Sequence, residues 1–241
     1  MTYEYEQIKE GLYVCRSEIH TFGTDAFLLT GFSRYHAKDR VCDLGTGCGI
    51  IPMLMQRDRP PRMIYAVDIQ PEAIQQLQSG ISKCRITPQI QPICADLRNL
   101  WDDAPLGQLE LVVCNPPYKA NQAGILSDDP CKQIARHETM CNISDICEAA
   151  AKLLNYHGRL CLCCRPERLT DVMCVMRESG IEPKRLRFIC KTPDSPPWLF
   201  LLEGIKGGKP FLRMEPTLFV RSGDGMTSEA AQICHFGDDK I

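Results

Sequence analysis

The sequence predicts a doubly wound α/β fold, in which helices cover both faces of a mostly parallel sheet. Two observations carry this prediction. Short apolar runs that fit buried strands alternate with segments that have the periodicity of amphipathic helices. The first clear strand runs into a glycine-rich turn at residues 45–49 and then into an apolar helical pattern. That strand–turn–helix context is typical of a ligand-binding loop.

The composition fits one globular domain. The chain has 241 residues, of which 44% are hydrophobic and 24% charged, and this is enough to bury a sizeable core. No apolar run is long enough to span a membrane, and the first six residues lack a basic leader. We therefore expect a cytoplasmic protein with no membrane partner, divided into an N-terminal cap (1–40), a core of sheet and helices (41–204) and a C-terminal extension (205–241).

The 15 cysteines are an odd number, and several fall inside predicted strands. Free thiols that behave as small apolar residues are the better interpretation. Cys161 and Cys164 form a CxxC pair, but no second pair follows, so we expect no metal site.

A short helix is expected just before the glycine turn. Residues 26–29 are apolar, and Thr24 or Asp25 is a plausible N-cap for them. This helix would lie against the ligand end of the first strand, although an amphipathic helix with no ligand contact has the same local pattern.

The glycine turn itself includes Asp43, Gly45, Thr46 and Gly47. Glycines let the backbone approach a ligand closely, and the following helix offers unpaired N–H groups. Ile50 stands where the dinucleotide fingerprint has its third glycine. The loop therefore suits a ligand without a pyrophosphate; a tight turn with no ligand is the alternative.

Two further strands end in acidic residues. A strand at residues 63–67 ends in Asp68, which is placed to accept from both hydroxyls of a ribose. After a helix at 72–83, a strand at 90–94 is followed by Asp96, which either accepts from an adenine amino group or simply forms a turn. Their neighbours Ile69 and Leu97 join them as candidate cofactor contacts.

The strand at residues 109–113 opens into Asn115-Pro116-Pro117-Tyr118. The two prolines fix the backbone and remove two donors. The side-chain oxygen of Asn115 and the carbonyl of Pro116 can then accept from one planar NH₂ group, and the ring of Tyr118 can stack on the base that carries it. A plain Pro-Pro turn is the alternative.

The rest of the chain completes the sheet. Residues 119–140 form a polar segment that ends near Arg136 and His137, which are either substrate contacts or a surface charge cluster. A helix (144–154), a strand (158–164), a helix (167–179) and an antiparallel pair (186–190 and 198–203) follow.

Basic residues gather late in the chain, among them Lys184, Arg185 and Arg187. The formal net charge is −2, so a nucleic-acid partner would have to be held by a local patch of this kind. A phosphate track and a solvated face both fit the pattern.

These motifs together resemble those of class I methyltransferases, and in particular the bacterial family that modifies valine tRNA on adenine N6. The resemblance spans nearly the whole chain; it is carried by residues 22–29, the loop at 43–49, Asp68, Asp96, Asn115–Tyr118, 136–138 and 166–169. It implies a Rossmann-like, seven-stranded sheet with antiparallel last strands, the cofactor S-adenosylmethionine, and tRNA or another structured RNA as partner, with no obligate protein partner.

The resemblance also implies roles. Gly45 and Gly47 admit the methionine moiety, Asp68 holds the ribose, Asp96 contacts the adenine, and the residues from Asn115 to Tyr118 hold the target base. Phe22 joins the late basic residues as a substrate contact. The Asn-Pro-Pro-Tyr motif also occurs in enzymes that methylate rRNA guanines, DNA adenines or a protein glutamine, and a non-catalytic RNA-binding or partner-binding module that keeps the fold is a further alternative.

Overall fold

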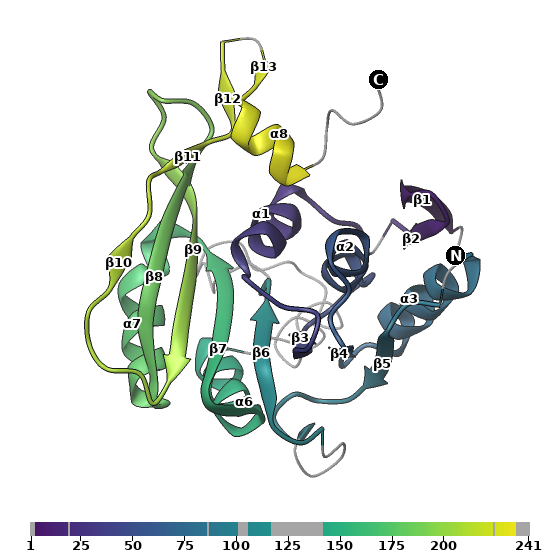
Figure 1. Cartoon of the computed structure of the whole chain (residues 1–241), viewed down its shortest axis with the longest axis horizontal. Coiled ribbons are helices and arrows are strands. Elements are labelled where there is room, and N and C mark those ends of the chain that lie inside the picture. Colours follow the sequence, from purple (N-terminus) through teal and green to yellow (C-terminus); the bar gives the residue numbers. More distant parts are fainter. Residues whose placement is uncertain are drawn as a thin grey trace, which may run out of the picture.

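The computed structural model describes residues 3–18, 20–85, 87–100, 106–116, 142–223 and 225–234. Its centre is a nine-stranded sheet whose main path runs β10-β8-β9-β7-β6-β3-β4-β5 (Figure 1). Four of its strands are β3 (Arg40–Leu44), β4 (Met63–Asp68), β5 (Ile90–Cys94) and β6 (Leu109–Cys114), and helices follow β3, β4 and β6 as predicted.

The parallel half of the sheet contains its switch point. From β3 the chain moves outward through β4 to β5 and then returns to place β6 on the other side of β3. In open α/β sheets, ligands bind beyond the carboxyl ends of the strands where the order reverses in this way. The expected site therefore lies at the ends of β3 and β6.

The other half ends in antiparallel strands, as predicted. Strand β9 (Pro197–Lys206) runs antiparallel both to β7 (Leu154–Cys164) and to β8 (Ile181–Cys190), so β7 and β8 point the same way. The sheet continues past β8, however, because two short strands of the C-terminal extension pair with β8 in parallel: β10 (Arg213–Met214) and β11 (Leu218–Phe219).

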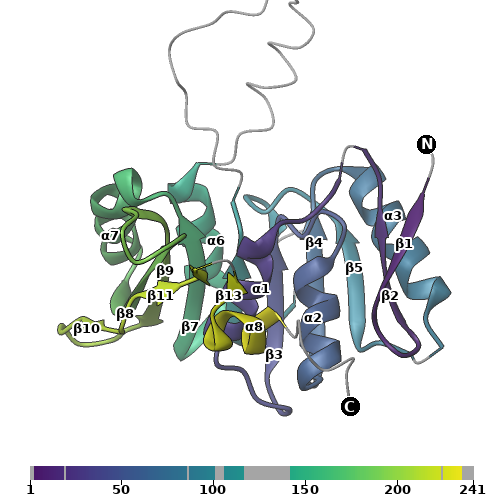
Figure 2. The same cartoon turned by 90° about the horizontal axis from the view of Figure 1, so that it is seen from above.

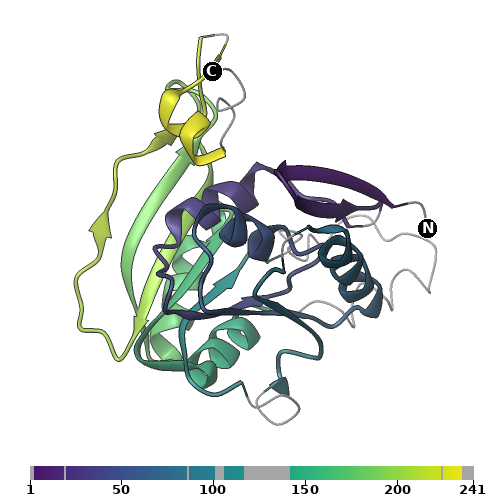
Figure 3. The same cartoon turned by 45° about the vertical axis from the view of Figure 1, so that its right-hand side comes forward.

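Helices cover both faces of this sheet. On one side lie α1 (Thr24–Phe32), α2 (Ile50–Asp58) and α3 (Pro71–Lys83), and on the other α6 (Ile143–Leu153) and α7 (Leu169–Glu178), which a 3₁₀ turn (Pro166–Arg168) precedes. Figure 3 shows the purple and blue helices above the sheet and the green α6 below it. Each face carries its own apolar cluster, and this two-sided burial explains why the strands read as continuous apolar runs. No helix in the described ranges is long and apolar enough to cross a membrane.

Two terminal segments pack onto the first helical layer. An N-terminal hairpin, β1 (Glu4–Lys9) and β2 (Leu12–Arg16), lies over α3 (Figure 2), and the sequence analysis did not anticipate it. At the other end, β12 (Arg221–Ser222) and β13 (Gly225–Met226) form a small hairpin, after which α8 (Ser228–Cys234) packs on α1.

The CxxC pair is divided by the pleat of β7. Cys161 belongs to the apolar cluster on the α1 face, whereas Cys164 packs against the cluster on the α6 face, because residues three apart on a strand point to opposite sides. Within the described residues, no three His, Cys, Asp or Glu side chains are grouped to hold a metal ion.

Candidate functional site

The glycine turn joins β3 to α2 through three left-handed residues: Gly45 has φ +74°, Gly47 +54° and Gly49 +79°. The N–H groups of Gly45 and Thr46 both donate to the carbonyl of Val67 at 2.9 Å, so β4 holds the turn in place. The glycines have different tasks. A Cβ at Gly49 would lie 2.3 Å from Leu77 Cδ1, whereas one at Gly45 or Gly47 would meet nothing within 4 Å.

Asp43 is a buried carboxylate whose oxygens are still available to accept hydrogen bonds. Its side chain is only 1% exposed, and neither oxygen has a hydrogen-bond partner among the described residues; the buried hydroxyl of Thr46 is also unpaired. Burial raises the pKa of Asp43 to about 7; the nearby Thr46 hydroxyl, although outside hydrogen-bond geometry, opposes the rise, and Asp68 adds to it. Buried polar groups in native proteins are normally paired. The Asp43 carboxylate and the Thr46 hydroxyl, beside an open glycine turn, therefore indicate a ligand-binding site.

Asp68 ends β4 and faces the same turn. Its Oδ2 accepts from the N–H of Gly47 at 2.9 Å, and its Oδ1 accepts from the N–H of Gln70 at 3.0 Å. A carboxylate has about four acceptor positions, so both oxygens can still accept from two adjacent hydroxyls. The next residue, Ile69, is 42% exposed and offers an apolar surface for a flat ring.

Asp96 follows β5 and is already engaged. Its carboxylate receives Arg98 in a bidentate pair, including Nε bonds of 3.0 Å to each oxygen. The hydrogen bond from Arg98 lowers the pKa of Asp96 despite some burial. Asp96 is thus both a turn former and a half-buried acceptor, and Leu97 beside it packs against the α6-face apolar cluster. Its contact with a cofactor adenine stays a prediction.

Asn115 leaves β6 at the switch point, on the other side of β3 from Asp68. Its Nδ2 donates to Asp25 Oδ2 at 3.2 Å, and its Oδ1 accepts from the thiol of Cys163 at 3.0 Å. Pro116 is half-buried beside it. The predicted contacts Pro117, Tyr118, Arg136 and His137 lie outside the described residues.

Sequence reasoning missed both partners of Asn115. Asp25 was considered as a helix cap, but α1 begins at Thr24 with Gly23 as its N-cap and no side-chain cap bond. For Cys163 the sequence pattern predicts only a thiol within a strand. Neither residue carries a local pattern that would reveal its contact with Asn115, because 90 and 48 positions separate them from it.

Phe22 stands just before α1 as a half-buried ring. It packs on Phe27 with ring centroids 6.1 Å apart, and the guanidinium of Arg16 lies 5.5 Å from its centroid. This packing joins the N-terminal hairpin to α1, and a substrate contact of Phe22 stays a prediction.

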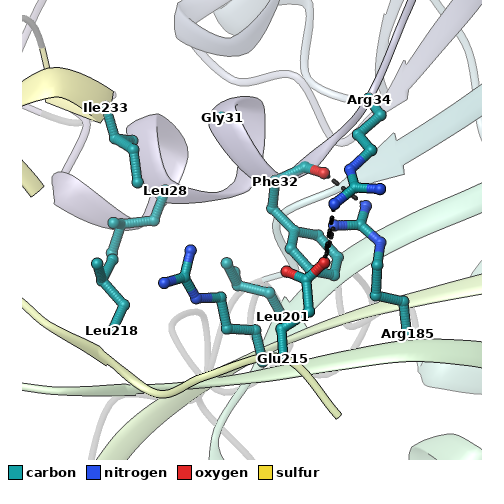
Figure 4. Close-up of a pocket in the computed structure, with 10 residues that line it drawn as sticks. Leu28, Gly31, Phe32, Arg34, Arg185, Leu201, Glu215, Leu218 and Ile233 are labelled. Atoms are coloured by element: carbon teal, nitrogen blue, oxygen red, sulfur yellow. Dashed lines mark hydrogen bonds and ion pairs between the residues drawn. The ribbon is translucent and has the colours of Figure 1, made fainter. Parts of the chain in front are cut away.

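The predicted basic track needs a correction. Arg185 is 5% exposed and pairs with Glu203 at 2.9 Å and with Glu215 at 3.2 Å. It lines a cavity of about 120 Å³, and Figure 4 shows it beside Arg34 and the ring of Phe32. A guanidinium that is buried and already paired with two carboxylates cannot serve as a free phosphate contact.

The neighbours of Arg185 are engaged as well. Lys184 donates to the carbonyls of residues 209, 210 and 211 at 2.8–3.0 Å. Arg187 donates to the carbonyl of Pro216 at 2.9 Å and pairs with Glu229 at 2.6 Å. These three cations fasten the C-terminal extension to β8. Their clustering in the sequence therefore reflects these contacts within the protein.

Fold and site together define a class of protein. A sheet of this order, with an open glycine turn after its first parallel strand, an acid after the second and Asn-Pro-Pro after the fourth, is that of a Rossmann-like methyltransferase. The model of the methyltransferase small-domain family matches residues 20–173, and the chain belongs to that family.

Curated relatives agree with this assignment, and a solved structure agrees with the fold. A protein of Parabacteroides distasonis, named a tRNA1(Val) (adenine(37)-N6)-methyltransferase, is 29% identical over 181 residues, 75% of each chain. One of the same name from Tolumonas auensis is 29% identical over 208 residues, 86% of this chain and 84% of that one. A predicted O-methyltransferase of Agrobacterium tumefaciens superposes with a TM-score of 0.71 at 17% identity, covering 88% of this chain and 95% of its own.

S-adenosylmethionine is the cofactor of this class, and the described residues fit it. The open space over Gly45 and Gly47 admits a ligand chain, the unpaired carboxylate of Asp43 suits a cationic ligand, and Asp68 can accept from ribose hydroxyls. Ile69 supplies an apolar contact for the base.

Proposed function

We propose that this protein transfers a methyl group from S-adenosylmethionine to the exocyclic N6 of an adenine in tRNA, in the anticodon loop of valine tRNA and at position 37. The relatives' names support the substrate. The structural observation that carries the proposal is the Asn115 carboxamide, held at the carboxyl end of β6 next to the β3 turn.

The protein's own part in the reaction is orientation. The cofactor supplies, when bound, an electrophilic methyl group on a positively charged sulfur. Asn115 Oδ1 and the carbonyl of Pro116 accept the two N–H groups of the target, which turns the nitrogen lone pair toward that methyl. Bound S-adenosylmethionine would supply that methyl group, and the proton lost from the target nitrogen would pass to solvent. Alignment of this kind can contribute ~7–11 kcal/mol to lowering a barrier, so no strong base is required.

A tRNA would approach along the carboxyl edge of β6, β7 and β8. Lys191 follows β8 on this edge, and its carbonyl accepts from the N–H of Arg221 at 2.8 Å. Both side chains are exposed and form no ion pair with another described residue. We therefore propose Lys191 and Arg221 as phosphate contacts in place of Arg185. An anticodon loop presents its bases without the opening of a long duplex, and such a substrate implies action in the cytoplasm.

Mass spectrometry of nucleosides tests the substrate. N6-methyladenosine should disappear from purified valine tRNA when the gene is deleted, and should return when the purified protein and cofactor are added. A transcript with guanine at position 37 is the matched control and should stay unmethylated. Methyl transfer to guanine or to a protein glutamine instead would keep the role of Asn115 and replace the substrate; no cofactor binding at all would favour a non-catalytic module.

A further inference from the structure

The carboxamide of Asn115 forms hydrogen bonds on two sides with residues of other elements. Asp25 on α1 receives its Nδ2 at 3.2 Å, and Cys163 on β7 donates to its Oδ1 at 3.0 Å. Cys163 is fully buried and Asp25 half-buried. The amide therefore sits between a group that only accepts and a group that donates.

This arrangement selects one of the two possible amide orientations. A carboxylate has no proton to give, so only the NH₂ end of Asn115 can face Asp25 favourably. In the flipped orientation, Oδ1 would face the negative oxygen of Asp25, and the NH₂ end would occupy the place where the target amine needs an acceptor. The selected orientation keeps Oδ1 as the acceptor.

Asp25 is itself fixed in place. Its Oδ1 accepts from the N–H of Ala26 at 3.1 Å while Oδ2 receives Asn115. A Cβ on Gly23 would lie 2.8 Å from Asp25 Oδ1, so the glycine leaves room for the folded-back carboxylate. The first turn of a helix also favours a negative charge.

We propose that Asp25 is a positioning residue for methyl transfer, because it sets the orientation in which Asn115 presents its oxygen to the target amine. This inference rests on the proposed function, in which Asn115 holds the amino group. Asp25 touches neither the methyl nor the base in this scheme and acts only through Asn115.

A reciprocal exchange separates positioning from a general structural role. Asp25→Asn replaces the acceptor-only partner by one that can also donate, so Asn115 is no longer held in one orientation and position, and kcat should fall by up to about 10²-fold, the loss that a small misplacement at a reacting centre can cause. Asn115→Asp in the same chain restores one donor and one acceptor across the contact and leaves a carboxylate oxygen for the target. The double exchange should recover most of the lost kcat, while Asp171→Asn, an exposed Asp on α7, serves as the matched control.

The dissociation constant of S-adenosylmethionine, measured for each variant by calorimetry, should change by no more than a few-fold. A normal kcat in Asp25→Asn would overturn the proposal, and so would an exchange variant that folds and binds cofactor but stays as slow as the single variant.

A second readout does not depend on any substrate. The chain has five asparagines, so ¹⁵N-asparagine labelling gives few side-chain amide signals, and the one lost in Asn115→Asp identifies Asn115. Its two proton shifts should move in Asp25→Asn and stay unchanged in Asp171→Asn. An unmoved signal would overturn the contact. If the shifts move but the wild-type protein methylates no RNA, the proposed function fails and the orientation of Asn115 by Asp25 stands.

Discussion

The two halves of the sheet differ in how their buried acidic side chains are paired. At the ends of β3 and β4, the side chains of Asp43 and Thr46 are buried and have no hydrogen-bond partner among the described residues, and the glycine turn beside them is open. Across β7, β8 and β9, the charges form a linear series of ion pairs, in which each side chain pairs with the next: Asp39, Arg159, Glu203, Arg185, Glu215, Arg34. Unsatisfied groups in a native protein call for a ligand, whereas a satisfied network fixes the architecture.

The halves also differ in how their acids titrate. Burial raises the pKa of Asp43 to about 7, so its contribution to stability is present at acidic pH and is lost as the pH rises toward 7. Burial alone would also raise the pKa of Glu203, but Arg185 and Arg159 lower it. Its contribution is present at neutral pH and is lost as the pH falls through that lowered value. The position of a charge in the sequence does not tell these cases apart.

The largest expected effect is on stability. Arg185→Met leaves the buried carboxylate of Glu203 and the half-buried carboxylate of Glu215 without their shared partner, and the loss of one member of such a network costs about 3–5 kcal/mol of unfolding free energy. Chemical denaturation measures this, with Arg213→Met on exposed β10 as the control. Cofactor affinity should stay within about twofold once the variant is folded. A loss below about 1 kcal/mol would contradict the architectural role of Arg185.

Asn115→Ala should cost about 10²-fold or more in single-turnover rate, because the target nitrogen loses its aligned acceptor. Cofactor affinity should change only a few-fold, since the acceptor matters when the target is bound. Asn155→Ala, which removes an amide bonded to Glu110, is the control and should turn over normally. Near-normal turnover of Asn115→Ala would remove Asn115 from the role proposed here.

Asp68→Ala should weaken S-adenosylmethionine binding by about 1–3 kcal/mol, because hydroxyl groups lose a charged acceptor and the N–H of Gly47 loses its partner. Calorimetric titration measures the change, with Asp58→Asn at the end of α2 as control. The unfolding free energy should fall much less than in Arg185→Met. Unchanged cofactor affinity would take the ribose role away from Asp68.

The smallest effect concerns RNA. Neutralising Lys191 and Arg221 should flatten the salt dependence of tRNA binding by up to about 0.7–0.9 per lost phosphate contact. Lys38→Gln together with Arg62→Gln, at the opposite edge of the sheet, removes the same charge and should leave the slope unchanged. Equal slopes in both pairs would mean that the edge beyond β8 does not meet phosphates.

The strand and helix pattern predicted the sheet, and it placed the glycine turn and Asp68 at the carboxyl ends of their strands, because a glycine turn and an acid at a strand end are local signals. The structure confirms the antiparallel end of the sheet and the helices around residues 72–83 and 144–154. The N-terminal hairpin was missed because its strands β1 and β2 pair with each other outside the main sheet.

Long-range polar partners were beyond local reading. Lys184, Arg185 and Arg187 look like a basic patch in the sequence, yet their partners come from later segments. Arg185 and Arg187 pair with Glu203, Glu215 and Glu229, and Lys184 donates to the carbonyls of residues 209–211. In the same way, the contact between Asp25 and Asn115 exists only because α1 packs beside the switch point of the sheet. Clusters of charge in a sequence predict a surface only if no later segment folds back onto them.

The most direct test of the claim that Asp43 is left without a partner for the cofactor is the pH dependence of cofactor binding. If the ionised carboxylate is kept unpaired for a cationic ligand, affinity for S-adenosylmethionine should fall by up to tenfold for each pH unit below about 7. Calorimetry between about pH 5.5 and 7.5, where an α-amino group stays largely protonated, should show this fall, with proton release on binding. Asp43→Asn should bind more weakly and show no such dependence. A wild-type affinity that is flat over this range, or equal to that of Asp43→Asn at every pH, would contradict the account.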